Sequence, residues 1–434
     1  MNAKKLIIAS LIAFSFPKIS IAEVWTLDSC INYAISHNID VRSRSLDCRS
    51  AELDVIEAKD RFLPEVSAGA SQSFNFGRGL TASNIYADRN TSNFGWNVGL
   101  SLPIFQGLSA KRQLDLAKAN LAAMLENIEA VKDDVSLRVM SQYLQVLYCS
   151  ELHQVALEQE RISKINLEHQ QTLFEAGKIP ELDLTIARSQ LAQDQLATTT
   201  TANDYKIALI DLAHLLQLTD VENFNIAPLS ETETILPNAT TIFANAMELN
   251  HNIKASQLSI TTAEKQISLA KSGYIPRLSF SAGLSSAYYY VSGTENPSFG
   301  SQMKDNFNKS IGFTLSIPIF DAFSTRNSRR KAEVQRLNAE LQYDNAKTTL
   351  QKAIQQAYAQ SEAATAKYKA GITARDATLE ALKAMQEKYN FGRANATEFE
   401  QAKTDYIKAS IETIQAKYEA LLRLRILQFY NTGE

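Results

Sequence analysis

Apolar residues recur at alternating steps of three and four along a segment that contains neither glycine nor proline between Gly107 and Gly177. This stripe consists of Leu114, Ala117, Leu121, Met124, Ile128, Val131 and Val135. Such heptad-like spacing is typical of coiled-coil helices. Residues 323–391 are equally rich in helix-forming residues and contain only Gly371 as a break. The pattern therefore predicts two very long helices, over residues 107–176 and 322–391.

Four shorter segments also have helical composition, and their lengths pair with the long helices. They cover residues 27–62, 181–217, 242–274 and 394–430. At 1.5 Å per residue, the long helix 107–176 spans about 105 Å, and 27–62 and 181–217 span about 54 and 55 Å. Two short helices placed end to end match one long helix. We therefore expect antiparallel helical columns that form the wall of a tube.

Four segments alternate between apolar and small polar residues with the period of two that indicates β-strands. They are residues 65–77, 92–103, 277–290 and 310–320. Their length of about 10–12 residues suits tilted membrane strands, and aromatic residues gather at both ends of the strands. The second face is small and polar, as a water-filled lumen requires. A membrane β-barrel is favoured over the alternative of two hairpins packed on a soluble core.

Four strands cannot close a barrel, and an open sheet edge is not tolerated in lipid. The chain is therefore predicted to oligomerise within outer-membrane lipid. A dimer would supply eight strands, whose interior side chains normally fill. A trimer would supply twelve strands and leave a pore.

An internal repeat organises the chain. At an offset of 212 residues Asn38 matches Asn250, and at an offset of 215 Pro103 matches Pro318 and Gly177 matches Gly392. The predicted domains are a first repeat over 23–220 with a β-hairpin at 64–105, a linker at 221–239, and a second repeat over 240–434 with a β-hairpin at 276–320.

The N-terminus has the features of a secretory signal peptide over residues 1–22. Lys4 and Lys5 precede an apolar run, residues 6–16, and Ser20-Ile21-Ala22 offers a small-x-small cleavage site. No later stretch contains 18 consecutive apolar residues, so no transmembrane helix is predicted. These features predict an exported protein.

Composition and motifs argue against several other classes of function. The net charge of −3 gives no electrostatic reason to bind nucleic acid. Cys30, Cys48 and Cys149 form no disulfide framework, and we expect them to be buried small apolar residues. Cys149 and His153 could share a metal ion, but no third ligand lies nearby. No phosphate-binding loop and no catalytic spacing is present. We predict no enzyme activity, cofactor or metal.

The repeated junctions SLPIFQG and SIPIFDA, together with the turns FEAGKIPELD and YNFGRANATEFE, resemble the TolC family of outer-membrane efflux proteins over essentially the whole mature chain. The resemblance implies a homotrimer with a twelve-stranded membrane β-barrel and a long α-helical barrel in the periplasm. It also implies a passive duct for efflux or type I secretion, which docks to a periplasmic adaptor and an inner-membrane pump.

Carried over to this chain, the family's adaptor-contacting tips fall on Ala176, Gly177, Phe391 and Gly392. The resemblance implies a periplasmic gate at Asp183, Tyr389, Arg393, Glu398 and Gln401. Two positions depart from the family pattern: the expected arginine is displaced by one residue to Arg393, and an expected acid is Gln401.

Each of these roles has an alternative. Asp183 and Glu398 are acids in the first turn of a helix, where the helix dipole favours them, and Asn395 with Glu398 resembles a capping box. At the level of the whole protein, the alternatives are a barrel-anchored structural or adhesive coiled-coil surface protein and a soluble periplasmic adaptor. The exported substrate stays open among drugs, metals and secreted peptides or proteins.

Overall fold

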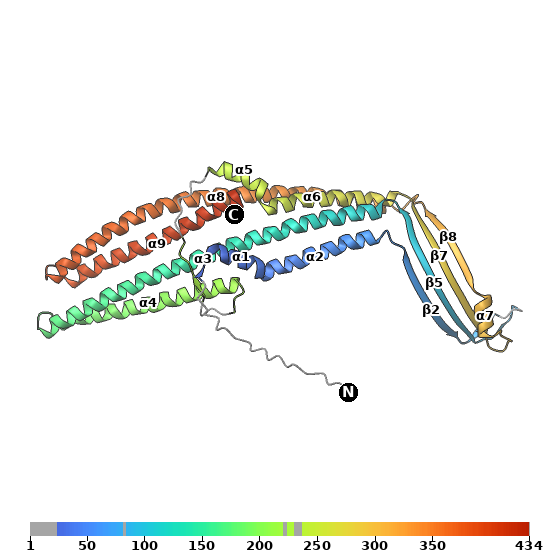
Figure 1. Ribbon diagram of the computed structural model, residues 1–434, viewed down its shortest axis with the longest axis horizontal. Helices are drawn as coiled ribbons and strands as arrows, with labels where there is room; N and C mark the ends of the chain where they lie inside the picture. Colours follow the sequence, from blue (N-terminus) through green and yellow to red (C-terminus); the bar gives the residue numbers. More distant parts are fainter. Residues whose placement is uncertain (1–23, 81–83, 220–223, 230–236, 434) are drawn as a thin grey trace, which may run out of the picture. The chain divides into compact units, whose positions relative to one another are not determined.

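The computed structural model describes residues 24–80, 84–219, 224–229 and 237–433 (Figure 1). These residues divide into two compact units. The sheet unit comprises residues 39–133, 236–358 and 427–434, and the hairpin unit comprises the remainder. The predicted signal peptide, residues 1–22, lies outside the described residues, as does part of the predicted linker.

The sheet unit contains a four-stranded antiparallel sheet. Its strands are β2 (Glu65–Asn75), β5 (Thr91–Gln106), β7 (Arg277–Val291) and β8 (Asn308–Ser316). The spatial order is β2-β5-β7-β8, so the two sequence hairpins join through β5 and β7 and lie side by side (Figure 1). All four predicted strands are present.

The two faces of the sheet differ in the way that the alternation predicts. Leu278 lies opposite Leu315 and Phe280 lies opposite Phe313, with the two phenyl centroids 5.2 Å apart. On the other face the facing residues are small, as in the pair Ser281 and Gly312. Phe313 is 67% exposed, so the apolar face around it has no cover within the chain.

The two proline junctions are not equivalent, because the strand predicted over residues 92–103 continues through Pro103 to Gln106. Pro103 lies within β5, where the β5–β7 register shifts between Pro103 and Phe105. A bulge tolerates proline because one residue is left without a ladder hydrogen bond. Pro318 instead follows the last residue of β8, Ser316.

The segments that connect the two strands of each hairpin contain further short elements. Residues 78–91 contain a short pair of strands, β3 (Arg78–Leu80) and β4 (Tyr86–Asp88). Residues 291–307 contain the helix α7 (Phe299–Asp305), which packs against β7 through hydrogen bonds of the Gln302 side chain to both main-chain groups of Tyr289. Elements of three to seven residues are too short to show a periodicity in the sequence.

Two helices that the sequence predicts as continuous are broken at asparagines. Residues 27–62 form α1 (Leu27–His37) and α2 (Ile39–Asp60), and 242–274 form α5 (Ala239–Leu249), α6 (His251–Ala270) and the 3₁₀ turn η1 (Lys271–Tyr274). Asn38 and Asn250 have extended backbones, with ψ of 135° and 119°. The Asn250 side chain accepts from the Ile253 N–H and starts the next helix.

The helix break at Asn38 separates two of the cysteines. Cys30 and Cys48 lie on α1 and α2, two separate helices and not one as predicted. Their thiols and that of Cys149 are free and buried, as expected.

The hairpin unit contains the ends of two helical hairpins. Its helices are α1, the part of α3 (Ser109–Glu175) from Asp134 onward, α4 (Glu181–Leu215), and the parts of α8 (Ser324–Asn390) and α9 (Ala396–Thr432) within residues 359–426. The strands β1 (Val24–Trp25) and β6 (Asn225–Ile226) pair in parallel. The buried Tyr143 hydroxyl on α3 lies 3.1 Å from Trp25 O and 2.6 Å from Ala227 O, which fixes this ladder. Within the described residues, no helix is both long and apolar enough to cross a bilayer.

Within the second hairpin, α8 and α9 approach closely at Gly371. A Cβ atom placed on Gly371 would lie 2.9 Å from Thr413 Oγ1 and 3.3 Å from Thr413 Cα. Thr413 is buried and its hydroxyl donates to Ala409 O at 2.6 Å. Glycine is therefore required here by space, although its φ is ordinary for a helix.

We predict that Gly371→Ala lowers the free energy of unfolding. Overpacking costs about 1–3 kcal/mol, which exceeds the roughly 1 kcal/mol gained in helix propensity. Adding Thr413→Ala should recover part of the loss. Gly300→Ala on α7, where an added Cβ meets nothing within 4 Å, is the control and should not destabilise. Thermal unfolding in detergent measures all four proteins, and a stabilised Gly371→Ala variant would contradict the close approach.

Candidate functional site

The two hairpin turns have the same backbone structure. In each turn a glycine with φ of +68° follows the helix, Gly177 after α3 and Gly392 after α8. The Gly177 N–H donates to Phe174 O and the Lys178 N–H donates to Leu173 O. This pair of bonds is the Schellman motif, and it recurs after α8. An added Cβ would meet nothing at either glycine, so the positive φ and not the available space requires glycine.

The helices that leave the turns begin differently. α9 starts with a complete capping box, in which the Glu398 N–H donates to Asn395 Oδ1 at 2.9 Å and the Asn395 N–H donates to Glu398 Oε2 at 3.0 Å. α4 begins after Pro180 without a side-chain cap. The capping role predicted for Asn395 and Glu398 is therefore confirmed. Asp183 lies in the first turn of α4, as expected.

Tyr389 joins the two hairpins near the turns. Its hydroxyl accepts a hydrogen bond from the Gln170 side chain on α3, and its ring stacks on Phe399 of α9 at a centroid distance of 5.0 Å. Burial raises the pKa of Tyr389, and the nearby charge of Asp183 raises it further. The Tyr389 hydroxyl thus keeps its proton in this contact at physiological pH.

The remaining predicted gate residues are not connected to Tyr389. Gln401 Nε2 donates to Asp405 Oδ1 at 3.0 Å along α9. The Arg393 N–H donates to Lys388 O and completes the Schellman turn. Among the described residues, neither Asp183 nor Arg393 forms a side-chain ion pair. The structure therefore brings Asp183 near Tyr389 without a direct bond, and the hydrogen-bond partner of Tyr389 is Gln170.

A buried polar cluster, which the sequence analysis missed, joins three helices of the hairpin unit. We define it as Ser163 on α3, Asp194 on α4 and Lys403 on α9, with two glutamines, Gln159 and Gln190. Lys403 Nζ lies 2.8 Å from Asp194 Oδ2, and both side chains are 2% exposed. Ser163 Oγ accepts from Lys403 and donates to Asp194.

The glutamines and one further acid complete the surroundings of this ion pair. Gln159 and Gln190 donate to Asp194 Oδ1 at 2.6 and 3.1 Å. Glu400 Oε2 lies 3.8 Å from Lys403 Nζ. Burial raises the pKa of Glu400, and Asp194 adds to this effect while Lys403 opposes it. Lys403 Nζ and both carboxylate oxygens of Asp194 therefore each have at least one hydrogen-bond partner.

A signal for this cluster was present in the sequence. Continuing the apolar stripe of α3 by steps of seven from Val135 reaches Gln142, Cys149, Ala156, Ser163 and Gln170. The stripe thus changes from large apolar residues to small and polar ones, and its last two positions make the contacts to Lys403 and Tyr389. Periodicity shows that these positions face a neighbour, but it does not identify the neighbour.

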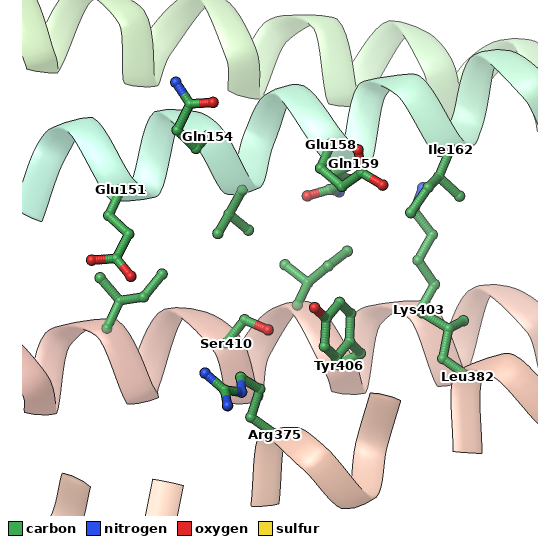
Figure 2. Close-up of a pocket in the computed structure, with 13 residues that line it drawn as sticks. Glu151, Gln154, Glu158, Gln159, Ile162, Arg375, Leu382, Lys403, Tyr406 and Ser410 are labelled. Carbon is green, nitrogen blue, oxygen red and sulfur yellow. The ribbon is translucent and has the colours of Figure 1, made fainter. Parts of the chain in front are cut away.

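A cavity of about 280 Å³ lies beside the cluster, between α3, α8 and α9. Figure 2 shows Lys403, Tyr406 and Ser410 on α9 opposite Glu158 and Gln159 on α3. The buried Ser410 hydroxyl has no hydrogen-bond partner among the described residues.

Cys149 and His153 each contact another side chain of the hairpin unit. Cys149 Sγ accepts from Gln145, and His153 Nδ1 lies 3.2 Å from Thr201 Oγ1, so each of these two side chains has another partner than a shared metal. Within the described part of the chain, no group of three or more His, Cys, Asp or Glu side chains is placed to hold a metal ion.

The chain matches one protein family over both halves. The family model described as "Outer membrane efflux protein" matches residues 30–217 and again residues 243–430. The outer membrane efflux protein BepC of Brucella suis is 21% identical over 92% of this chain and 83% of its own length. The outer membrane protein TolC of Escherichia coli is 22% identical over 93% and 81%, respectively.

Solved structures share the fold at low sequence identity. The CmeC outer membrane channel of Campylobacter jejuni superposes with a TM-score of 0.77 at 17% identity, over 94% of this chain and 85% of that protein. The outer membrane protein VceC of Vibrio cholerae gives a TM-score of 0.73 at 14% identity, over 94% and 96%.

Proposed function

Because the chain belongs to the outer membrane efflux protein family, we propose that three copies form a passive duct for efflux or type I secretion. The protein is an outer-membrane channel protein with its helical tunnel in the periplasm. In the proposal, the duct works with a periplasmic adaptor and an inner-membrane pump, and the pump selects the substrate.

The observation that carries the proposal is the sheet with two open edges. β2 and β8 each pair on one side only within the chain, and the apolar face that includes Phe313 and Leu315 is exposed. Unpaired backbone groups are costly in lipid, so a second copy must supply the missing partner strands. Because β2 and β8 run antiparallel, β8 of one copy can pair with β2 of the next. Three copies give twelve strands and a pore lined by the small polar face.

The helices next to these edges support the same assembly. α2 leads into β2 and carries the exposed side chains Leu46 and Leu53, seven residues apart. α8 follows β8 and carries an exposed stripe of three residues at steps of three and four, namely Val334, Leu337 and Leu341. Neither stripe has cover within the chain, and pairing β8 with β2 would place the two stripes together as an antiparallel coiled coil.

Charge at the sheet end of these helices is also complementary. Asp60 is exposed in the last turn of α2, and Arg330 is exposed in the second turn of α8. An antiparallel arrangement of neighbouring copies would bring these opposite charges to the same level. Such a pair fixes register more than it adds stability, because exposed ion pairs contribute only about 0–1 kcal/mol.

The hairpin turns are the proposed periplasmic end. In this proposal Ala176, Gly177, Phe391 and Gly392 contact the adaptor. The gate consists of Asp183, Tyr389, Arg393, Glu398 and Gln401, with Gln170 added as the hydrogen-bond partner of Tyr389. The support is that Tyr389 links the two hairpins of one chain, so that opening must break its bond to Gln170.

The assembly is tested by native mass measurement of the protein extracted from outer membranes. We expect a detergent-stable trimer that conducts ions in planar bilayers. A monomer or dimer would overturn the twelve-strand arrangement. A trimer without conductance would keep the assembly and exclude the duct.

The orientation of the sheet is tested by charges on adjacent residues of β8. Phe313→Lys places a charge on the proposed lipid face and should impair insertion by up to about 4 kcal/mol, depending on its depth in the bilayer. Thr314→Lys points to the proposed lumen and should insert normally but change conductance. Phe313→Leu is the size control. Equal behaviour of the two lysine variants would show that the faces are assigned wrongly.

The gate is tested by removing the contact at Tyr389. Asp183→Ala combined with Tyr389→Phe should raise single-channel conductance, because it removes the bond to Gln170 and the nearby charge. Asn395→Ala is the matched control, since Asn395 lies outside the proposed gate and its side chain only caps α9. It should lower stability by about 0.5–2 kcal/mol at unchanged conductance. Bilayer recordings beside melting curves decide the point, and an unchanged conductance in the double variant would leave these residues with structural roles alone.

A further inference from the structure

The buried polar cluster connects the two helical hairpins of one chain. Ser163 and Asp194 belong to the α3–α4 hairpin, and Lys403 belongs to the α8–α9 hairpin. The Gln170–Tyr389 bond lies one heptad further along α3 and crosses between the same two hairpins. Both connections are polar, although Ser163, Gln170, Asp194 and Lys403 are almost completely buried.

Polar burial is common along the helix contacts of the hairpin unit. The polar residues with little exposure there are Ser136, Ser163, Gln170, Asp194, Ser361, Lys403, Ser410 and Thr413. By contrast, the packing of α2 on α3 in the sheet unit consists of Val55, Ala58 and Ala117 with Leu114 and Leu121. At the cluster the hairpins thus meet through buried polar groups, which lie beside apolar residues such as Ile162 and Ile407.

The contribution of this contact to stability follows from the energetics of a buried ion pair. Removing Lys403 and Asp194 from water costs hydration, which their attraction and the bonds from Ser163, Gln159 and Gln190 repay. Well-packed apolar residues of similar size are often as stable or more stable at such positions. The cluster therefore fixes the alignment of the two hairpins, but it adds little to the strength of their association.

The free energy of separating the hairpins depends on whether the exposed side chains are charged or apolar. Lys403 and Asp194 regain hydration in water, and this compensates for the lost ion pair. Apolar side chains at the same positions would instead be exposed to water at a cost that grows with their area. A fully satisfied buried charge pair is thus suited to an interface that must open and close repeatedly.

We propose that Lys403, Asp194 and Ser163 form a separable contact at which the α8–α9 hairpin parts from the α3–α4 hairpin when the duct opens. The inference rests on the proposed function as a duct and adds residues that act away from the turns. Lys403 and Asp194 are positioning residues: they align the hairpins in the closed state and allow separation at low cost.

The test compares removal of one charge with removal of both. Lys403→Met leaves Asp194 buried without its partner, which disfavours the closed state. We expect an open fraction raised by more than about tenfold and a lower melting temperature. Lys403→Met combined with Asp194→Leu makes the contact apolar. We expect an open fraction lowered by about tenfold or more, with an unchanged or higher melting temperature.

Two controls separate this role from a merely structural one. Lys403→Arg keeps the charge and should stay near the wild type in open fraction. Arg138→Met with Asp134→Leu removes an exposed ion pair within α3 and should change neither readout. If the single and double variants change the melting temperature but leave the open fraction unchanged, the cluster is structural and the proposal is wrong.

A second measurement does not depend on conductance. Nitroxide labels at the exposed residues Gln193 on α4 and Thr404 on α9 report the distance between the hairpins in the full-length trimer. The single variant should populate longer distances than the wild type, and the double variant should populate them less. Unchanged distances in a conducting trimer would overturn the separable contact. Changed distances in a trimer that never conducts would overturn the duct and keep the contact.

Discussion

Backbone hydrogen bonding at the two edges of the sheet is the constraint on which the rest of this structure depends. Four strands cannot satisfy their own outer N–H and C=O groups, and lipid offers no alternative partner. Each edge strand adjoins a helix in the chain: α2 precedes β2 and α8 follows β8. Uncovered apolar side chains such as Leu46 and Val334 lie on the helices that adjoin these strands in the chain. In the proposed assembly, sheet and helices therefore require the same neighbours.

The two repeats share backbone features and differ in side-chain chemistry. Asn38 and Asn250 end helices in both halves, and Gly177 and Gly392 form the same Schellman turn. The positive φ of +68° requires glycine at the two turns, whereas the extended conformation of Asn38 and Asn250 is open to other residues. The starts of α4 and α9 differ, since only α9 has a capping box. Duplication has thus preserved the main-chain geometry while the contacts between the hairpins diverged.

The packing changes from apolar to polar along the length of α3. Near its start, Leu114 and Leu121 pack against α2, and near its end Ser163 and Gln170 contact α9 and α8. Apolar contacts give an interface that stays closed, because separation exposes apolar surface to water. Polar contacts give an interface whose opening costs less. The sequence of α3 thus places apolar contacts near one end of the helix and adds polar contacts near the other.

The sequence by itself determined the features that depend on local periodicity and on single backbone conformations. The four strands, the two long helices, the exposed apolar face of β8, the glycine turns and the Asn395–Glu398 capping box all follow from residues close together in the chain. The helix breaks at Asn38 and Asn250 were not predicted, because asparagine is also tolerated inside helices and only packing selects the extended conformation. The partner of Tyr389 and the cluster of Ser163, Asp194 and Lys403 were decided by tertiary structure alone. Their residues are 31 to 240 positions apart, and periodicity shows that a side chain faces a neighbour but cannot say which neighbour it meets.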